Sequence, residues 1–251
     1  MTTTLFLLKF TGGLPIVTLS ALLSTYLIWH LIGYGFKSDS RIADKFMINA
    51  PSTVLPTATR QIKRAVDLAI VIPALILSAP LFLIIGLLVR LSSGNPVLFR
   101  QKRIGEGGRT FNMYKFRTMV NGSDKFDPEL YDERCHKMAD DPRVTKIGRF
   151  LRKTSLDELP QLYNVLRGDM SMVGPRPELP WIVARYQPWQ LERLAVPQGI
   201  TGWWQINGRS KNPMHLNVEF DLYYVRNHSL TLDFLILLRT PFVVLSGIGA
   251  F

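Results

Sequence analysis

The sequence predicts a membrane-associated, mainly α-helical protein of the α+β class, with a small β-hairpin in a cytosolic catalytic domain. Two long blocks without charged residues, 10–36 and 68–89, hold much of the apolar 47% of the 251 residues. After the second block the chain has the mixed composition and short alternating patterns of a globular domain. These observations predict an N-terminal transmembrane anchor at 1–37, a linker at 38–59 and a catalytic domain at 60–251.

The first apolar block is long enough to cross a bilayer. Lys9 and Lys37 bound it, and no Asp, Glu, Lys or Arg lies between them. About 20 apolar residues span the hydrocarbon core, so a tilted helix fits. A cleaved signal peptide is the alternative, but its expected basic start is missing from Met1–Thr4 and the apolar run is too long. Basic residues dominate 37–65, so this flank is expected in the cytoplasm and the N-terminus outside.

The second apolar block lies in a membrane helix expected over 66–90. Basic residues flank it on both sides, so a full crossing would place one basic cluster outside, against the positive-inside tendency. Pro73 and Pro80 interrupt the block, and proline kinks or breaks a helix. A re-entrant helix that turns near Pro80 satisfies both observations, with Ser78 bonding a carbonyl freed at the break. On these residues alone, a proline-kinked crossing helix is an equal alternative.

The elements after the second block are short. Alternating runs at 96–101 and 110–116 flank the glycine-rich segment 105–108, which predicts a β-hairpin. Residues 121–142 are polar and irregular, and we expect a loop over the site. The apolar run 240–251 is too short to cross a bilayer, so we expect it to dock at the membrane surface as an interfacial element.

Charge, cysteine and histidine content limit the function. Thirty Lys and Arg against 19 Asp and Glu give a net charge of +11, which suits nucleic acid, anionic lipid or a phosphorylated substrate. A single cysteine excludes an internal disulfide and fits a cytosolic catalytic portion. The four histidines lack ligand spacing, which argues against a zinc site.

The chemistry is expected around two adjacent carboxylates, Asp157 and Glu158. Apolar residues at helical spacing from Leu159 to Leu166, followed by Gly168, predict a helix whose N-terminal end holds both carboxylates. Exposed N–H groups and the helix dipole favour the ionised carboxylate there. An ionised carboxylate is a competent nucleophile towards phosphorus, and an adjacent one can hold a divalent metal.

The same pair also fits a purely structural role. Ser155-x-x-Glu158 is a capping-box pattern, and in isolation this interpretation is favoured. Cations on both sides favour a site for phosphate esters instead, because guanidinium groups bind phosphate oxygens bidentately. Arg152 precedes the pair, and Arg176 follows it between two prolines in a stiff extended segment. These basic residues also fit a solvated or lipid-facing surface.

Several long motifs in register make the chain resemble the bacterial sugar transferase family, the monotopic polyprenyl-phosphate hexose-1-phosphate transferases. The resemblance covers about residues 60–251. The motifs that carry it are the interrupted apolar block 68–89, FRQKRIG at 99–105, YKFRTM at 114–119, TSLDELPQL at 154–162, RGDMS at 167–171, VGPRP at 173–177 and GITGW at 199–203.

The resemblance implies transfer of a sugar 1-phosphate from a UDP-sugar to polyprenyl phosphate, which is undecaprenyl phosphate in most bacteria. Asp157 would attack the sugar-bearing phosphorus, expel UMP and form a phosphosugar-aspartyl intermediate that the lipid phosphate then attacks. Glu158 would position Mg²⁺, and Arg176 would hold phosphate, with Arg152 the weaker candidate for that task. The resemblance implies a location at the cytoplasmic face of the bacterial inner membrane. It also implies that the enzyme catalyses the initiating step of exopolysaccharide, O-antigen or related glycan assembly and has no nucleic-acid partner.

The chain departs from the family pattern twice. The family's membrane helix is re-entrant and broken at a Ser-Pro pair, whereas Ala79 separates Ser78 from Pro80 here. The family commonly reads Arg-Pro-Gly where this chain has Pro-Gln-Gly at 197–199. Asp221 lies in a further shared segment, where a structural role is the favoured interpretation. A membrane-bound phosphohydrolase with the same nucleophile and a non-catalytic scaffold of polysaccharide assembly are the alternative functions.

Overall fold

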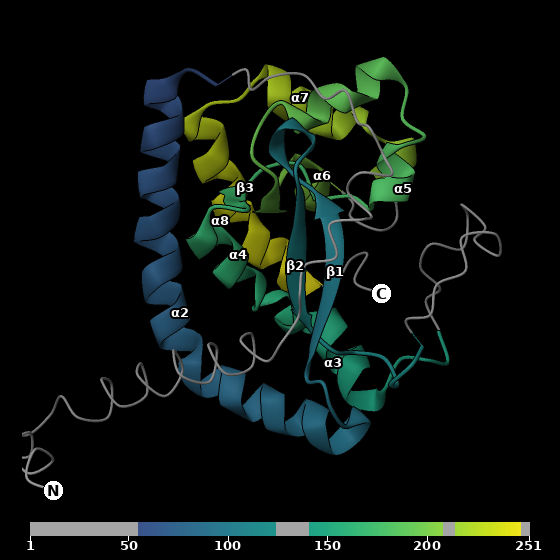
Figure 1. The fold of residues 1–251 in the computed structure, drawn as a ribbon. Helices are drawn as coiled ribbons and strands as arrows, with labels where there is room; N and C mark the ends of the chain where they lie inside the picture. Colours follow the sequence, from purple (N-terminus) through teal and green to yellow (C-terminus); the bar gives the residue numbers. More distant parts are fainter. Residues whose placement is uncertain (1–54, 124–140, 208–213, 247–251) are drawn as a thin grey trace, which may run out of the picture.

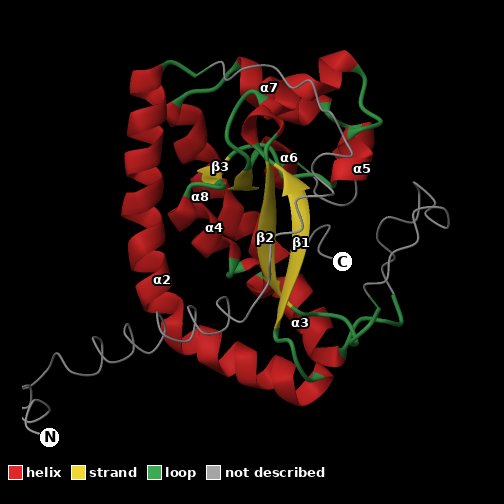
Figure 2. Cartoon of the chain, viewed as in Figure 1, coloured by secondary structure: helices red, strands yellow, loops and turns green. Residues whose placement is uncertain are grey.

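The computed structural model describes residues 55–123, 141–207 and 214–246. Within these residues the fold is mostly helical, with two small two-stranded sheets (Figure 2). The predicted anchor at 1–37 lies outside the described residues, as do most of the linker at 38–59 and most of the predicted loop at 121–142.

One long helix, α2 (Thr57–Ser93), precedes the rest of the fold and is continuous through both internal prolines. Figure 1 shows that α2 runs along one side of the domain and then bends beneath it. The Ser78 hydroxyl donates to the Ala74 carbonyl at 2.6 Å, a contact that bends helices. The predicted break near Pro80 is therefore a bend in an unbroken helix. Ser78 also does not bond the Ile76 carbonyl, the one that Pro80 leaves without its i+4 donor.

The two halves of α2 differ in how they meet the domain. In the first half, Lys63 pairs with Asp233 at 2.7 Å, and Asp67 accepts hydrogen bonds from the Ser171 hydroxyl and the Met172 N–H. In the second half many apolar side chains are exposed, among them Leu77, Ile84, Leu87 and Leu91. By length and composition alone, α2 is apolar enough to cross a membrane.

The predicted β-hairpin is confirmed. Strands β1 (Leu98–Ile104) and β2 (Thr110–Phe116) pair antiparallel, and the tight turn η2 (Glu106–Gly108) joins them. The turn needs a positive φ of 63° at Gly107, a backbone conformation that glycine adopts without strain. Phe116 packs on the second half of α2, so the hairpin is fixed against the long helix.

The remaining elements form the body of the domain around a short parallel sheet. They are α3 (Lys146–Thr154), η5 (Leu156–Glu158), α4 (Gln161–Arg167), β3 (Ser171–Val173), α5 (Pro180–Val183), η6 (Pro188–Leu194), β4 (Gly199–Thr201), α6 (Trp203–Ile206), η8 (Met214–Leu216), α7 (Glu219–Arg226) and α8 (Leu230–Ser246). Strand β3 pairs with β4, and a core of Val173, Val196, Tyr224 and Ile236 lies beside them. Helix α8 begins at Leu230, before the predicted apolar run 240–251. The last five residues of that run lie outside the described part.

Candidate active site

The two carboxylates lie in a short turn between two helices. Helix α3 ends at Ser155, which has the left-handed φ of 57°, so the chain changes direction directly before Asp157 and Glu158. Both residues belong to the 3-10 turn η5, and α4 begins only at Gln161. Gly168 ends α4 with a φ of 84°, which confirms the predicted glycine stop. The pair thus precedes the predicted helix, in a turn of its own.

Helix α3 is fixed closely against the segment that follows β2. A Cβ at Gly148 would lie 2.0 Å from the Thr118 carbonyl oxygen, so only glycine fits there. The same oxygen accepts a hydrogen bond from the Thr145 N–H at 3.0 Å. This close approach brings Arg152, on the last turn of α3, within 3.0 Å of the Thr118 hydroxyl, which accepts from its Nε.

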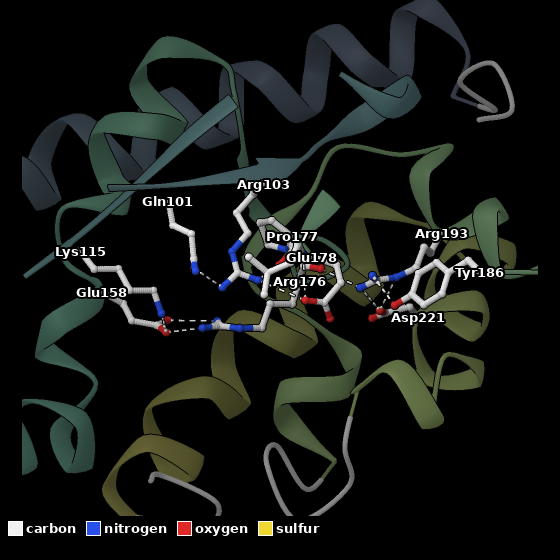
Figure 3. Close-up of polar contacts among 11 residues, drawn as sticks. Gln101, Arg103, Lys115, Glu158, Arg176, Pro177, Glu178, Tyr186, Arg193 and Asp221 are labelled. Atoms are coloured by element: carbon white, nitrogen blue, oxygen red, sulfur yellow. Dashed lines mark hydrogen bonds and ion pairs between the residues drawn. The ribbon is translucent and has the colours of Figure 1, made fainter. Parts of the chain in front are cut away.

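Glu158 is held by two cations (Figure 3). Arg176 binds its carboxylate bidentately, with Nη2 at 2.5 Å from Oε1 and Nη1 at 3.2 Å from Oε2. Lys115 Nζ donates to Oε1 at 3.0 Å. Burial alone would raise the pKa of Glu158, but Arg176 and Lys115 outweigh it and hold this pKa well below the ordinary value. Glu158 is therefore ionised at neutral pH.

The capping box is not formed. Ser155 makes no side-chain cap bond to η5, and its own N–H donates to the carbonyl of Arg152 instead of to Glu158. Because the Glu158 carboxylate faces Lys115 and Arg176, capping does not account for this acidic residue.

Asp157 has a different environment. Its side chain is buried, and among the described residues none makes a hydrogen bond or an ion pair with its carboxylate. Burial raises the pKa of Asp157, and the negative charge of Glu158 raises it further. The positive charges of Lys115, Arg152 and Arg176 lower it. The pKa of Asp157 is therefore raised, whereas the helix terminus predicts a lowered pKa, because desolvation is the larger effect. Asp157 is thus the carboxylate of the pair that no described residue engages.

Arg152 is the cation beside Asp157 with open donors. Its Nε is engaged by Thr118, and none of the described residues accepts a hydrogen bond from its two terminal nitrogens. Burial lowers the pKa of Arg152, and the negative charges of Asp157 and Asp141 partly restore it. Arg176 uses one N–H of each terminal nitrogen for Glu158. Arg152 is thus a second guanidinium, next to Asp157, whose donors suit an incoming phosphate.

The site contains two basic residues that the sequence interpretation did not single out. Lys115 in β2 contacts Glu158, and burial lowers its pKa. Arg103 in β1 pairs with Glu178 at 3.2 Å, and burial lowers its pKa to about 10. A signal for Lys115 was present, because strand alternation places it on the face opposite its apolar neighbours Tyr114 and Phe116.

The structure thus brings four predicted site residues, Asp157, Glu158, Arg176 and Arg152, into one cluster. The predicted helix-break residues are separate, since the hydrogen bonds of Ser78 stay within α2. Among the described residues, no group of three acidic, histidine or cysteine side chains forms a ready-made metal cage.

Comparison with known proteins identifies the family. A family model described as "Bacterial sugar transferase" matches residues 58–247. The chain is 44% identical over 194 residues to the exopolysaccharide production protein ExoY of Sinorhizobium fredii, covering 73% of this chain and 86% of that protein. It is 39% identical over 214 residues to an undecaprenyl-phosphate galactose phosphotransferase of Salmonella typhimurium, covering 82% of this chain and 45% of that protein.

A third relative is also named as an undecaprenyl-phosphate sugar phosphotransferase. The chain is 39% identical over 195 residues to a UDP-N-acetylgalactosamine-undecaprenyl-phosphate N-acetylgalactosaminephosphotransferase of Aeromonas hydrophila, covering 75% of this chain and 45% of that protein. This chain therefore spans most of ExoY but less than half the length of the two phosphotransferases. The family match includes every residue of the cluster around Asp157, and the chain belongs to the bacterial sugar transferase family.

Proposed function

We propose that this enzyme transfers a sugar 1-phosphate from a UDP-sugar to polyprenyl phosphate, undecaprenyl phosphate in bacteria, and releases UMP. The observation that carries the proposal is a buried carboxylate, Asp157, that has no partner among the described residues and lies beside one that two cations hold, Glu158. A nucleophile that attacks an anionic diphosphate needs an open oxygen and nearby positive charge. Relatives named for undecaprenyl phosphate and for exopolysaccharide production support this acceptor and a role in exopolysaccharide production.

The proposed reaction has two displacements at one phosphorus. An Asp157 oxygen attacks the sugar-bearing phosphorus, the bond to the bridging oxygen breaks, and UMP leaves with that oxygen and its electron pair. A phosphate oxygen of the lipid then attacks the same phosphorus and the Asp157–phosphorus bond breaks. The carboxylate is regenerated and the sugar remains on a polyprenyl diphosphate. A raised pKa suits Asp157 to the first step, since a more basic carboxylate is a stronger nucleophile.

The cations have separate tasks in this mechanism. Arg152 binds the diphosphate through the terminal nitrogens that no described residue engages, close to Asp157. Arg176 and Lys115 hold Glu158 and supply positive charge around the phosphorus. The family resemblance implies Arg176 as the main phosphate ligand, and we propose that Arg152 shares this task, because its terminal nitrogens have no partner among the described residues.

Mg²⁺ fits the donor set with Glu158 as its protein ligand. Oxygen Oε2 accepts one hydrogen bond, from Arg176, so a second lone pair is left for a cation. Mg²⁺ usually binds through one or two carboxylates and the substrate's phosphates rather than through a protein cage. When bound, it neutralises charge on the diphosphate.

We also propose that α2 is a re-entrant membrane helix and that the domain lies on the cytoplasmic face of the inner membrane. Three features support this placement: the bend of α2, the uncovered apolar side chains of its second half, and the polar contacts that fix its first half to the domain (Figure 1). The net charge of +11 favours an anionic leaflet. The lipid phosphate would then meet the site at the membrane surface.

The direct test uses the full chain in nanodiscs with undecaprenyl phosphate, Mg²⁺ and either UDP-galactose or UDP-N-acetylgalactosamine. We expect continuous UMP release, beyond one UMP per enzyme, only with the lipid acceptor, together with a labelled lipid-linked sugar phosphate. A phosphohydrolase would release UMP equally fast without the lipid and would leave the lipid unlabelled. A scaffold would release no UMP with any donor of a UDP-sugar panel. Either result would contradict the proposed function.

A further inference from the structure

The segment 175–178, which carries Arg176, is held through its main-chain carbonyls. Its two prolines have no N–H to donate. Each of its four carbonyls nevertheless accepts a hydrogen bond from another part of the chain. The donors are Gly199 N to Pro175 O (2.8 Å), Arg193 Nη2 to Arg176 O (2.7 Å), Arg103 Nη1 to Pro177 O (3.2 Å) and Ile104 N to Glu178 O (2.9 Å). Two of the four donors are guanidinium groups, drawn in Figure 3.

Arg193 is completely buried, and its guanidinium is oriented from two sides. Its Nε and Nη2 donate to Asp221 Oδ2, at 3.0 and 2.5 Å, and its Nη1 donates to the Tyr186 hydroxyl at 3.2 Å. The Asp221 side chain is only 1% exposed. Because desolvation is costly, a buried ion pair is often no more stabilising than apolar residues of the same volume. Fold stability alone therefore gives little reason for an arginine here.

We infer that Arg193 and Asp221 are positioning residues of the transferase site, an inference that rests on the proposed function. Asp221 orients the Arg193 guanidinium, and Arg193 fixes the main chain of Arg176, whose own guanidinium holds Glu158. The path thus runs from a buried pair in η6 and α7 to the carboxylate beside the nucleophile. A displacement of about 1 Å at a reacting centre can cost roughly a hundredfold in rate, so the position of Arg176 matters.

Gln198, which occupies a position where the family commonly has proline, supports the same arrangement. Its Nε2 donates to the carbonyls of Arg193 and Val196, both at 3.0 Å. A proline has no side-chain amide and makes neither bond. This departure from the family pattern therefore fixes the main chain of Arg193 itself.

The test compares Asp221→Asn and Arg193→Lys with Leu194→Val in the full chain in nanodiscs. Leu194 is the neighbour of Arg193 and is equally buried, but it packs in an apolar cluster with Ile104 and Val183. We expect both variants of the pair to lower kcat/KM by about tenfold or more, with the UDP-sugar that the wild type turns over fastest. Leu194→Val should stay within about twofold of the wild type at a comparable loss of thermal stability.

A double-mutant cycle shows whether the pair acts through Arg176. In an Arg176→Lys background, Asp221→Asn should lower kcat/KM by less than about twofold, because the group that it positions has already changed. Full additivity of the two losses overturns the inference. Losses in Asp221→Asn and Arg193→Lys that only follow the folded fraction, as in Leu194→Val, also overturn it.

Hydrogen exchange gives a readout that needs no turnover. In Asp221→Asn, the peptide spanning 172–180 should exchange faster than in the wild type, and in Leu194→Val it should not. Unchanged exchange in that peptide contradicts the positioning role. If the wild type releases no UMP with any UDP-sugar, the proposed function fails, whereas the exchange result still decides whether the pair fixes this segment.

Discussion

The two sides of the site differ in how much of their hydrogen-bonding capacity is used. On the held side, Arg176 and Lys115 both bind Glu158, and the Arg176 main-chain carbonyl accepts a hydrogen bond from Arg193. On the open side, Asp157 has no partner among the described residues, and the terminal nitrogens of Arg152 have none either. Both sides are largely buried, so burial does not explain the contrast.

The two sides therefore differ in role: the held side fixes the geometry of the site, and the open side supplies the reactive groups. A preorganised set of charges stabilises a transition state without reorganising during the reaction, and the held side has this character. A buried carboxylate without a partner is unfavourable for folding, so its presence points to chemistry. Substitutions on the two sides should therefore separate loss of stability from loss of turnover.

The largest expected effect is on turnover in Asp157→Asn. UMP release should fall by about a thousandfold or more, because the amide is not a nucleophile. The melting temperature should stay the same or rise, since a buried carboxylate without a partner is neutralised. Measurement needs a UMP-release assay and a thermal melt of the same preparation.

Glu158→Gln is the matched control for stability. It leaves Arg176 and Lys115 without their anion, so the melting temperature should fall by roughly 5–10 °C. Equal melting temperatures for Glu158→Gln and Asp157→Asn would remove the distinction between the held side and the open side.

The next effect concerns the open cation. Arg152→Lys should raise KM for the UDP-sugar and lower kcat/KM by roughly 10- to 100-fold, because an ammonium group cannot reproduce the guanidinium fork. Arg149→Lys is the control, since Arg149 lies on the same helix but is exposed. Equal kinetics for the two variants would show that Arg152 binds no phosphate.

A smaller effect is expected at the hydroxyl that orients Arg152. Thr118→Val keeps the shape but loses the acceptor for Nε, so kcat/KM should fall roughly five- to tenfold. Thr118→Ser keeps the acceptor and should remain close to the wild type. Steady-state kinetics of the two variants decide the point, and equal losses in both would assign Thr118 to packing alone.

The smallest effect is on the pH dependence. Only ionised Asp157 attacks phosphorus, so activity should fall as the pH drops through its pKa, which burial raises above the usual 3.8. Lys115 lowers this pKa, so Lys115→Met should shift the acid limb of kcat/KM to higher pH. A limb that stays in place or moves to lower pH in this variant would contradict the environment described for Asp157.

Local features of this fold were predictable from the sequence. The hairpin follows from strand alternation around glycines, and the end of α4 follows from Gly168, because both depend on neighbouring residues. Family membership was predictable from several motifs in register and is confirmed by the match over 58–247. The motifs also located the cluster around Asp157.

Features that depend on distant contacts were not predictable. Lys115 and Glu158 lie 43 positions apart, and Arg193 and Asp221 lie 28 apart, so no local pattern pairs them. The raised pKa of Asp157 was also missed, because the helix terminus is visible in the sequence but burial is not. The expected break in α2 is a bend, because α2 stays helical through Pro80.

The most direct test of the account is intact-protein and peptide mass spectrometry of the wild type mixed with its UDP-sugar and Mg²⁺, without lipid acceptor. We predict a mass increase equal to one sugar phosphate on the peptide that contains Asp157, accompanied by UMP and reversed by undecaprenyl phosphate. UMP formation without any adduct, or an adduct on another residue, would contradict the central claim that Asp157 carries the sugar phosphate.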